Sequence, residues 1–352
     1  MRVLVTGGAG FIGSFIVDAL VDQGHGVCVI DNLDPAAHDD EPLWLADGVD
    51  YRWGDVTDAD LWRGALPACD AICHQAARVG LGVDFADAPT YVASNALGTA
   101  VGLAVAHEQR FRGRLVLASS MVVYGEGAYS CPEHGAMPAP ARTVADLDAG
   151  RFEPRCPRCG CFLVPGLVDE DAPADPRNVY AATKLHQEHL AFAFAREHPE
   201  VAVTALRYHN VYGPRMPSFT PYAGVASIFR SALAAGERPR VFEDGGQRRD
   251  FVHVRDVARA NVAALTAGEP VIGPLNVASG QPATLLEMAQ ALAAAHGQGL
   301  EPDVVGGYRL GDVRHVTASI ERLRGLGFAP SVGLAEGMAE FAHAPQRRPP
   351  AH

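Results

Sequence analysis

Three residues of this chain have side chains suited to moving the proton of an alcohol: Ser120, Tyr180 and Lys184. Lys184 is the only lysine among 29 basic residues, and the other 28 are arginines. A lysine ammonium is a compact point charge that a planar guanidinium does not replace. Tyr180 and Lys184 are four residues apart, so on a helix they share one face and the cation favours the tyrosinate. We interpret them as an acid/base pair, although a lysine that persisted by chance is an open alternative on this residue alone.

Ser120 follows a predicted strand over Arg114–Ala118. In a doubly wound sheet the carboxyl ends of the strands face the ligand crevice. The serine hydroxyl could therefore hold the oxygen of the alcohol on which Tyr180 acts.

A glycine-rich loop, residues 6–13, follows one predicted strand and opens a helix. Its glycines let the backbone turn tightly and approach a pyrophosphate, which rests on amide donors at the helix N-terminus. Asp31 ends the next predicted strand, where a carboxylate accepts hydrogen bonds from a ribose and repels a 2′-phosphate. The pattern predicts NAD rather than NADP as cofactor, and the alternative is that Asp31 only caps a turn. The predicted contacts are Gly7, Gly10, Phe11, Ile12, Gly13, Asp31 and Asn32, with Asp55 and Val56 near the adenine.

Two copies of the pattern C-P-x-[H/C]-G begin at Cys131 and Cys156. Two such pairs complete a tetrahedral site with three thiolates and one imidazole. We predict a structural Zn²⁺ held by Cys131, His134, Cys156 and Cys159, with Cys161 as a bystander. A metal-free proline-rich loop and a redox-active thiol pair are the alternatives.

The elements that position these residues alternate between short β-rich runs and helical patterns, which is typical of a parallel sheet covered by helices. The predicted fold class is α/β, a Rossmann-type doubly wound parallel sheet with a smaller C-terminal α+β substrate lobe and a Cys-rich insertion. Residues 1–125 and 166–210 form the predicted NAD-binding domain, to which 255–265 return. Residues 126–165 form the zinc-binding insertion, 211–254 and 266–344 form the substrate-binding lobe, and 345–352 are a frayed tail.

The overall composition excludes some classes of partner. A net charge of −12 argues against a nucleic-acid footprint. No apolar run is long enough to span a bilayer, and the N-terminus shows no signal-peptide pattern. We expect a cytoplasmic protein without nucleic-acid or membrane partners.

The motifs together resemble the extended short-chain dehydrogenase/reductases, in the nucleotide-sugar epimerase/dehydratase branch. Besides the residues above, the resemblance rests on the segments 74–77, 207–215, 249–254 and 309–312. It implies that Gln75, Ala76, Ala77, Tyr180 and Lys184 contact NAD, and that the chain forms a homodimer through helices at about 89–108 and 179–197. It also implies that the nucleotide sugar is contacted by Ser120, Asn210, Arg215, Arg249 and Arg309. Of these, Asn210, Arg249 and Arg309 are expected to hold its diphosphate or the groups that flank the diphosphate.

The two residues after Ser120 narrow the choice among the reactions of this branch. Related 4,6-dehydratases carry an Asp-Glu pair there, whereas this chain has Met121 and Val122, which cannot transfer protons. This favours an NAD-dependent 4-epimerase with Tyr180 as acid/base over a net dehydrogenase or ketoreductase or a non-catalytic NAD-binding scaffold. The insertion resembles cysteine-bearing inserts of dTDP-L-rhamnose 4-epimerase-like proteins, which implies a deoxyhexose nucleotide among the dTDP- or UDP-hexoses.

Overall fold

The computed structural model describes residues 1–35, 37–38, 42–80, 84–218 and 224–345. Of the predicted frayed tail, residues 346–352 lie outside this range. In the described part, seven parallel strands form one sheet in the order β14-β9-β5-β4-β1-β2-β3. The strands are β1 (Arg2–Thr6), β2 (Gly26–Asp31), β3 (Asp50–Trp53), β4 (Ala71–His74), β5 (Gly113–Ser120), β9 (Val201–Tyr208) and β14 (Gly273–Val277).

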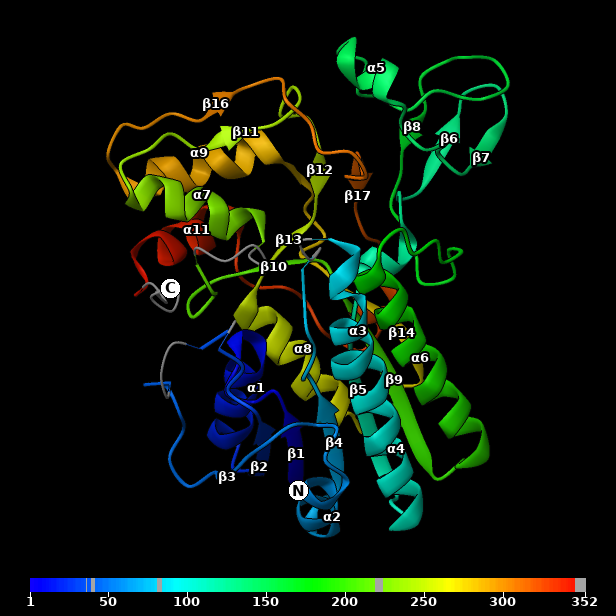
Figure 1. Cartoon of the computed structure of the whole chain (residues 1–352), viewed down its shortest axis with the longest axis vertical. Helices are drawn as coiled ribbons and strands as arrows, with labels where there is room; N and C mark the ends of the chain where they lie inside the picture. The colour runs from blue at the N-terminus through cyan, green and yellow to red at the C-terminus, as the bar shows by residue number, and fades with distance from the viewer. Residues whose placement is uncertain (36, 39–41, 81–83, 219–223, 346–352) are drawn as a thin grey trace.

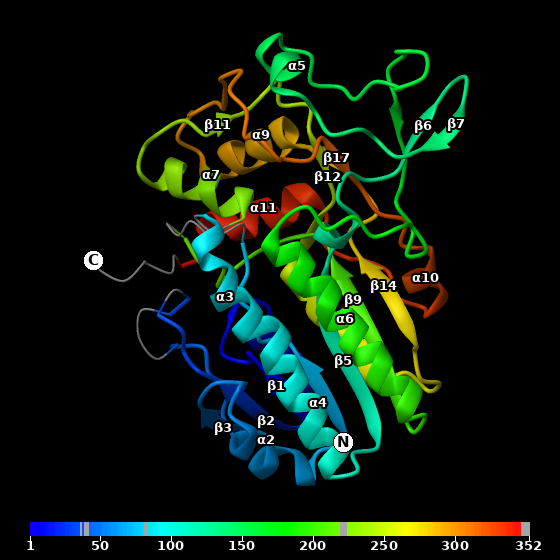
Figure 2. The same ribbon diagram turned by 45° about the vertical axis from the view of Figure 1, so that its right-hand side comes forward.

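Helices cover both faces of this sheet (Figures 1 and 2). Successive side chains of a strand point to opposite faces, so Val3 and Val5 join one core while Leu4 joins the other. One face is covered by α1 (Phe11–Asp22) and α8 (Val254–Thr266). The other is covered by α2 (Ala59–Ala65), α4 (Gly98–Glu108) and α6 (Val179–Glu197). A short helix, α3 (Ala88–Tyr91), runs into α4 through one π-helical segment, Val92–Leu97. This arrangement confirms the predicted Rossmann-type sheet.

One predicted boundary was wrong. The sequence-based division gave all of 266–344 to the substrate lobe, but residues 273–277 form β14, which pairs with β9 in the central sheet. The strand is short and contains Pro274, which has no N–H to donate and so weakens the strand signal in the sequence. Proline is tolerated here because β14 lies at the edge of the sheet.

A smaller lobe lies beyond the carboxyl ends of the strands (Figure 1). Two short parallel strands, β10 (Asn210–Tyr212) and β13 (Phe251–His253), pair where the chain passes between the central sheet and this lobe. Its own core is formed by the helices α7 (Val225–Ala234), α9 (Leu285–His296) and α11 (Leu334–His343). Short strands complete it: β11 (Arg240–Val241) with β16 (Asp303–Val304), and β12 (Arg248–Arg249) with β15 (Ala283–Thr284) and β17 (His315–Val316). After β17 the chain returns to the central sheet, where α10 (Glu321–Gly325) packs beside β14, so this part of 266–344 also lies outside the smaller lobe (Figure 2).

The insertion stands beside this lobe, at the upper right of Figures 1 and 2. It contains a small antiparallel sheet of β6 (Tyr129–Cys131), β7 (Gly135–Met137) and β8 (Val164–Pro165), with β6 in the middle, and the short helix α5 (Val144–Asp148). Its core is small and consists of Tyr129, Cys131, Ala139, Cys156 and Leu163. Among the described residues, no helix is long and apolar enough to cross a bilayer.

Candidate active site

The glycine loop is packed so closely that side chains would not fit at two of its positions. Gly7 has a φ of +69°, and a Cβ there would lie 2.8 Å from the backbone nitrogen of Ala76. A Cβ on Gly13 would lie 2.0 Å from the carbonyl oxygen of Gly7. Gly10 is the N-cap of α1, and among the described residues no side chain caps the first turn, which includes Phe11 and Ile12. These amides are available to an anion, as a dinucleotide pyrophosphate requires.

The carboxylate predicted to bind the ribose lies beside this loop. Asp31 accepts hydrogen bonds from the N–H of Ala9 at 3.0 Å and of Leu33 at 2.9 Å. A carboxylate has about four acceptor sites, so it can also accept from ribose hydroxyls. The Asn32 amide donates to Asp55 at 2.9 Å. Burial favours a higher pKa for Asp55, but hydrogen bonds from Thr57 and Asn32 outweigh it and lower the pKa.

The segment after β4 completes the predicted cofactor site. The backbone N–H of Gln75 donates to the Thr6 carbonyl at 3.1 Å, and that of Ala76 donates to the Thr6 hydroxyl at 3.1 Å. This places residues 75–77 next to the glycine loop. The Gln75 side chain turns toward α8, where its amide donates to Asn261 at 3.1 Å. Residues 75–77 therefore fit NAD through their backbone. Val56, which follows Asp55 in the sequence, is a buried core residue.

The three candidate catalytic residues come from β5 and α6. Ser120 is the last residue of β5, and Tyr180 and Lys184 lie on the first turns of α6, which Asn178 caps by accepting from the Ala181 N–H at 2.8 Å. Lys184 is buried and donates from Nζ to the Ala118 carbonyl at 2.9 Å. The end of β5 and the start of α6 are thereby held together.

The electrostatics of the pair show what the protein supplies without cofactor. Burial raises the pKa of Tyr180 to about 12, while a hydrogen bond with Ser120 opposes the rise. Burial lowers the pKa of Lys184 to about 7, and the carboxylate of Glu188 opposes the fall. Tyr180 therefore needs additional positive charge nearby before it can act as a base near neutral pH.

Glu188, which the sequence-based prediction missed, lies in a buried ion pair behind the reactive residues. Its carboxylate accepts from Arg207 Nε at 2.9 Å and Nη2 at 2.8 Å, and from the Ser119 hydroxyl. Arg207 also donates to the Tyr124 hydroxyl at 2.9 Å. A signal for Glu188 existed, because it follows Lys184 by four residues on the same helix face.

A second buried network, also not predicted, lies behind the glycine loop. His74 contacts the Thr6 hydroxyl through Nδ1 at 2.7 Å and the Thr99 hydroxyl through Nε2 at 2.9 Å. Gln187 on α6 donates to the same Thr99 hydroxyl at 2.7 Å. Burial, and then the charge of Lys184, lower the pKa of His74 to about 3, so this imidazole is neutral.

The residues predicted to bind the nucleotide sugar occupy different surroundings. Asn210 lies on β10, and within the described residues its Oδ1 is buried without a hydrogen-bond partner. Arg249 is buried on β12, whereas Arg309 is exposed with its guanidinium 5.5 Å from the ring of Phe242. Arg215 lies beside α1, with its guanidinium 2.8 Å from the Asp18 carboxylate and above the ring of Phe15.

Four potential metal ligands converge in the insertion. The ligand atoms of Cys131, His134, Cys156 and Cys159 all lie within 4.8 Å of one another. His134 Nδ1 lies 3.4 Å from Cys131 Sγ and 3.6 Å from Cys156 Sγ, and the sulfurs of Cys131 and Cys159 are 3.5 Å apart. Bonds of about 2.3 Å to sulfur and about 2.0 Å to nitrogen in a tetrahedron give ligand separations of about 3.5–3.8 Å, close to these distances, so the four atoms fit one zinc ion.

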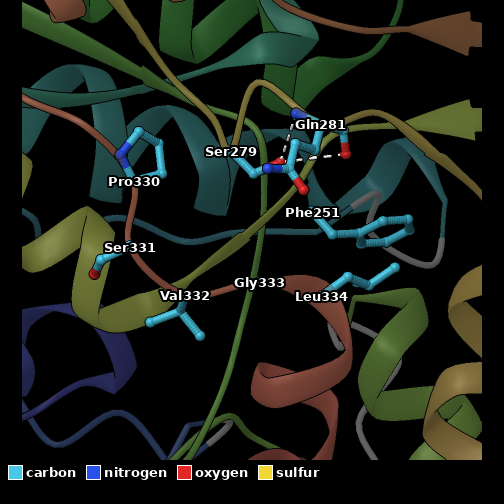
Figure 3. Close-up of a pocket in the computed structure, with 8 residues that line it drawn as sticks. All are labelled: Phe251, Ser279, Gln281, Pro330, Ser331, Val332, Gly333 and Leu334. Atoms are coloured by element: carbon cyan, nitrogen blue, oxygen red, sulfur yellow. Dashed lines mark hydrogen bonds between the residues drawn. The ribbon is translucent and has the colours of Figure 1, made fainter.

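A pocket on the smaller lobe is separate from these groups. Figure 3 shows it between the loop after β14, with Ser279 and Gln281, and the start of α11 at Leu334. Its wall is held by Asp250, which accepts from the Ser279 N–H at 2.6 Å and hydroxyl at 2.7 Å. None of its lining residues is a predicted cofactor, catalytic or sugar-nucleotide residue.

Comparison with known proteins defines the class. Residues 3–144 and 164–278 match the model of the NAD dependent epimerase/dehydratase family. The chain therefore belongs to this family, which confirms the resemblance and NAD as its cofactor. The gap between the two matched ranges, residues 145–163, lies within the insertion.

The proteins to which this chain is similar are named for more than one activity. A dTDP-L-rhamnose 4-epimerase from Burkholderia thailandensis is 35% identical over 97% of this chain and 93% of its own length. A dTDP-glucose 4,6-dehydratase from Streptomyces niveus is 31% identical over 97% of this chain and 91% of its own. The crystal structure of UDP-glucose 4-epimerase from Thermus thermophilus in complex with NAD superposes with a TM-score of 0.76, at 30% identity and with coverage of 97% and 98%.

Proposed function

We propose that this chain is a nucleotide-sugar 4-epimerase that inverts C4 of a dTDP- or UDP-hexose through a transient 4-keto sugar. The proposal is carried by two observations: Ser120, Tyr180 and Lys184 are held together where β5 ends and α6 begins, and the apolar residues Met121 and Val122 directly follow the serine. Apolar side chains cannot serve as the further acids and bases that a dehydration needs. The relative named as a dTDP-L-rhamnose 4-epimerase favours a deoxyhexose nucleotide as the substrate.

In the proposed mechanism, Tyr180 accepts the proton of the C4 hydroxyl and later returns it to the C4 oxygen. Ser120 donates a hydrogen bond to that oxygen and holds it beside Tyr180. Lys184 stabilises the tyrosinate, and Glu188 favours the charged form of the lysine. NAD, when bound, would supply the acceptor for the C4 hydride and then the donor that returns it, so the product has the oxidation state of the substrate. Inversion requires the keto sugar to present its other face before the hydride is returned.

The decisive experiment is proton NMR in D₂O on the purified protein, without added NAD, against a panel of dTDP- and UDP-hexoses. We expect inversion at C4 with no deuterium at carbon. Deuterium at C3 or C5 would overturn the mechanism, since it indicates enolisation. Conversion only after free NAD is added, with an oxidised product, would identify a dehydrogenase instead. No conversion, with NAD bound, would leave the scaffold alternative.

We also infer that Cys131, His134, Cys156 and Cys159 hold a structural Zn²⁺. The support is the match between their separations and tetrahedral geometry. A site with four protein ligands has no open position for substrate, so its role is structural. Cys161 lies 3.7 Å from Glu133 and is outside this set of four.

Elemental analysis of protein purified without chelator tests the metal. We expect one zinc per chain in the unaltered protein, well under one in Cys159→Ser, and full zinc in the controls Cys69→Ser and Cys161→Ser. Well under one zinc in the unaltered protein contradicts the site. Zinc lost in Cys161→Ser would show that the ligand set is different.

A homodimer through the α3–α4 and α6 face is proposed as well. Val92 and Leu97, in the segment between α3 and α4, are 49% and 50% exposed, although they are large and apolar. Light scattering should give twice the chain mass of 37.2 kDa for the unaltered protein and one chain mass for Leu97→Glu. The matched control is Ile272→Glu, an exposed apolar residue just before the edge strand β14, which should stay dimeric.

A further inference from the structure

One backbone segment, residues 307–316, carries or contacts both arginines expected at the diphosphate. Arg249 donates from Nη1 to the Arg314 carbonyl at 3.0 Å and from Nη2 to the Val313 carbonyl at 2.7 Å. The strand that contains Arg249, β12, also pairs in parallel with β17. Arg309 belongs to the segment itself. Any shift of this segment therefore moves both guanidinium groups.

The insertion holds the same segment from its other side. The Glu153 carboxylate accepts from Arg314 Nε at 2.9 Å and Nη2 at 2.6 Å, and contacts His315 Nε2 at 2.9 Å. The Tyr129 hydroxyl accepts from the His315 N–H at 3.1 Å. The approach is close, because a Cβ on Gly127 would lie 2.6 Å from the His315 carbonyl oxygen.

Further charges join the insertion to the smaller lobe. Arg142 donates to Glu243 at 2.6 Å and to the carbonyl of Asp312. Arg314 donates to the second Glu243 oxygen at 2.7 Å and to the Asp244 carboxylate at 2.8 Å. Arg314 is only 1% exposed, so its charge depends on carboxylates from both regions. Removing one of them leaves a buried cation short of partners, which is strongly unfavourable.

The metal ligands adjoin the residues that make these contacts. Cys131 follows Tyr129 on β6 by two residues, and Cys156 follows Glu153 by three. Two of the five side chains in the core of the insertion, Cys131 and Cys156, are themselves ligands. Such a small core cannot order a chain segment without a staple such as a metal ion.

From these contacts we propose that the insertion is a clamp: its metal fixes Tyr129 and Glu153, which position residues 307–316 and so the diphosphate-binding arginines Arg249 and Arg309. Glu153 is a positioning residue in this scheme and does not touch the reacting atoms. The inference rests on the proposed nucleotide-sugar substrate. Its consequence is that disturbing the clamp weakens binding of the nucleotide diphosphate while the chemistry at C4 and the retention of NAD stay intact.

The test compares Glu153→Gln with the matched control Arg151→Gln, an exposed residue of the insertion that pairs with Asp146. For Glu153→Gln we expect KM for the nucleotide sugar and Kd for UDP or dTDP, measured by calorimetry, to rise about tenfold, which corresponds to about 1.4 kcal/mol for one charged hydrogen-bond partner. The turnover number kcat, NAD content and zinc content should stay within about twofold, and Arg151→Gln should match the unaltered protein.

Other outcomes separate the clamp from the proposed function. A fall in kcat with KM and Kd unchanged overturns the clamp, as does a Glu153→Gln variant with normal KM and Kd. If UDP or dTDP binding weakens as expected but the unaltered protein converts no hexose, the clamp stands and the 4-epimerase proposal fails. A zinc-depleted protein that keeps its NAD should show the same rise in Kd as Glu153→Gln. Full affinity after zinc loss would overturn the role of the metal.

Discussion

The Rossmann sheet and the insertion both hold groups proposed to serve the substrate, yet they position them by different means. Ser120 ends a central strand and Lys184 lies on a long helix, and one hydrogen bond of 2.9 Å from Lys184 to Ala118 joins the two elements. In the insertion, positions depend on long side chains such as Glu153, and on the proposed metal. On the two proposals above, the chemistry rests on regular backbone geometry, while substrate binding rests on ion pairs between the insertion and the smaller lobe.

The largest expected effect concerns the catalytic residues held by the Rossmann sheet. Tyr180→Phe removes the acid/base group but leaves the helix and the glycine loop intact. We expect kcat to fall about 10²–10⁴-fold, with NAD content unchanged, because positioned proton transfer contributes a factor of about that size. Turnover by NMR and NAD released on denaturation measure the two quantities. Tyr51→Phe, on β3, is the control, and near-normal turnover in Tyr180→Phe would end the assignment.

A change of intermediate size tests how the sheet holds these groups. Glu188→Gln removes the charge that pairs with buried Arg207. We expect the free energy of unfolding to fall by about 3 kcal/mol, because a buried cation loses its partner. Urea unfolding measures it, with exposed Glu197→Gln on the same helix as the control. A loss below about 0.5 kcal/mol would show that the pair does not support the sheet.

The neutral imidazole behind the glycine loop predicts a pH effect specific to the Rossmann side. The pKa of His74 is about 3 when folded and ordinarily 6.5. Between these values only the unfolded chain binds the proton, so stability falls as the pH is lowered through this window. His74→Gln should lower the slope of the unfolding free energy against pH by up to about 1.4 kcal/mol per pH unit between about pH 5 and 6. An unchanged slope, as expected for exposed His343→Gln, would contradict the assignment.

The smallest expected effect concerns an exposed contact between the insertion and the smaller lobe. The Tyr308 hydroxyl donates to Asp148 on α5 at 2.7 Å, but this contact is exposed to solvent. Tyr308→Phe should change KM for the nucleotide sugar by less than about twofold, because exposed polar contacts contribute little to stability. A rise as large as that of Glu153→Gln would show that the clamp extends along α5.

Much of the fold and the candidate site could be predicted because the signals are local. The run from Gly7 to Gly13 encodes a turn and a helix start, and Tyr180 and Lys184 encode one helix face. The strand β14 was missed because Pro274 makes a short edge strand look irregular. Glu188 could have been found from its spacing to Lys184, but its partner Arg207 belongs to another strand.

By itself, the amino-acid sequence determined the family, the cofactor type and the residues proposed for catalysis and metal binding. The glycine loop, the Tyr180–Lys184 pair and each of the two Cys-containing pairs depend on spacing within one turn or one helix, which the backbone converts directly into geometry. Only the tertiary structure showed that Glu153 lies against Arg314, 161 residues away, and that Arg249 is held by the carbonyls of Val313 and Arg314. Such contacts arise where separate lobes meet, and no local spacing records which side chains will face each other there.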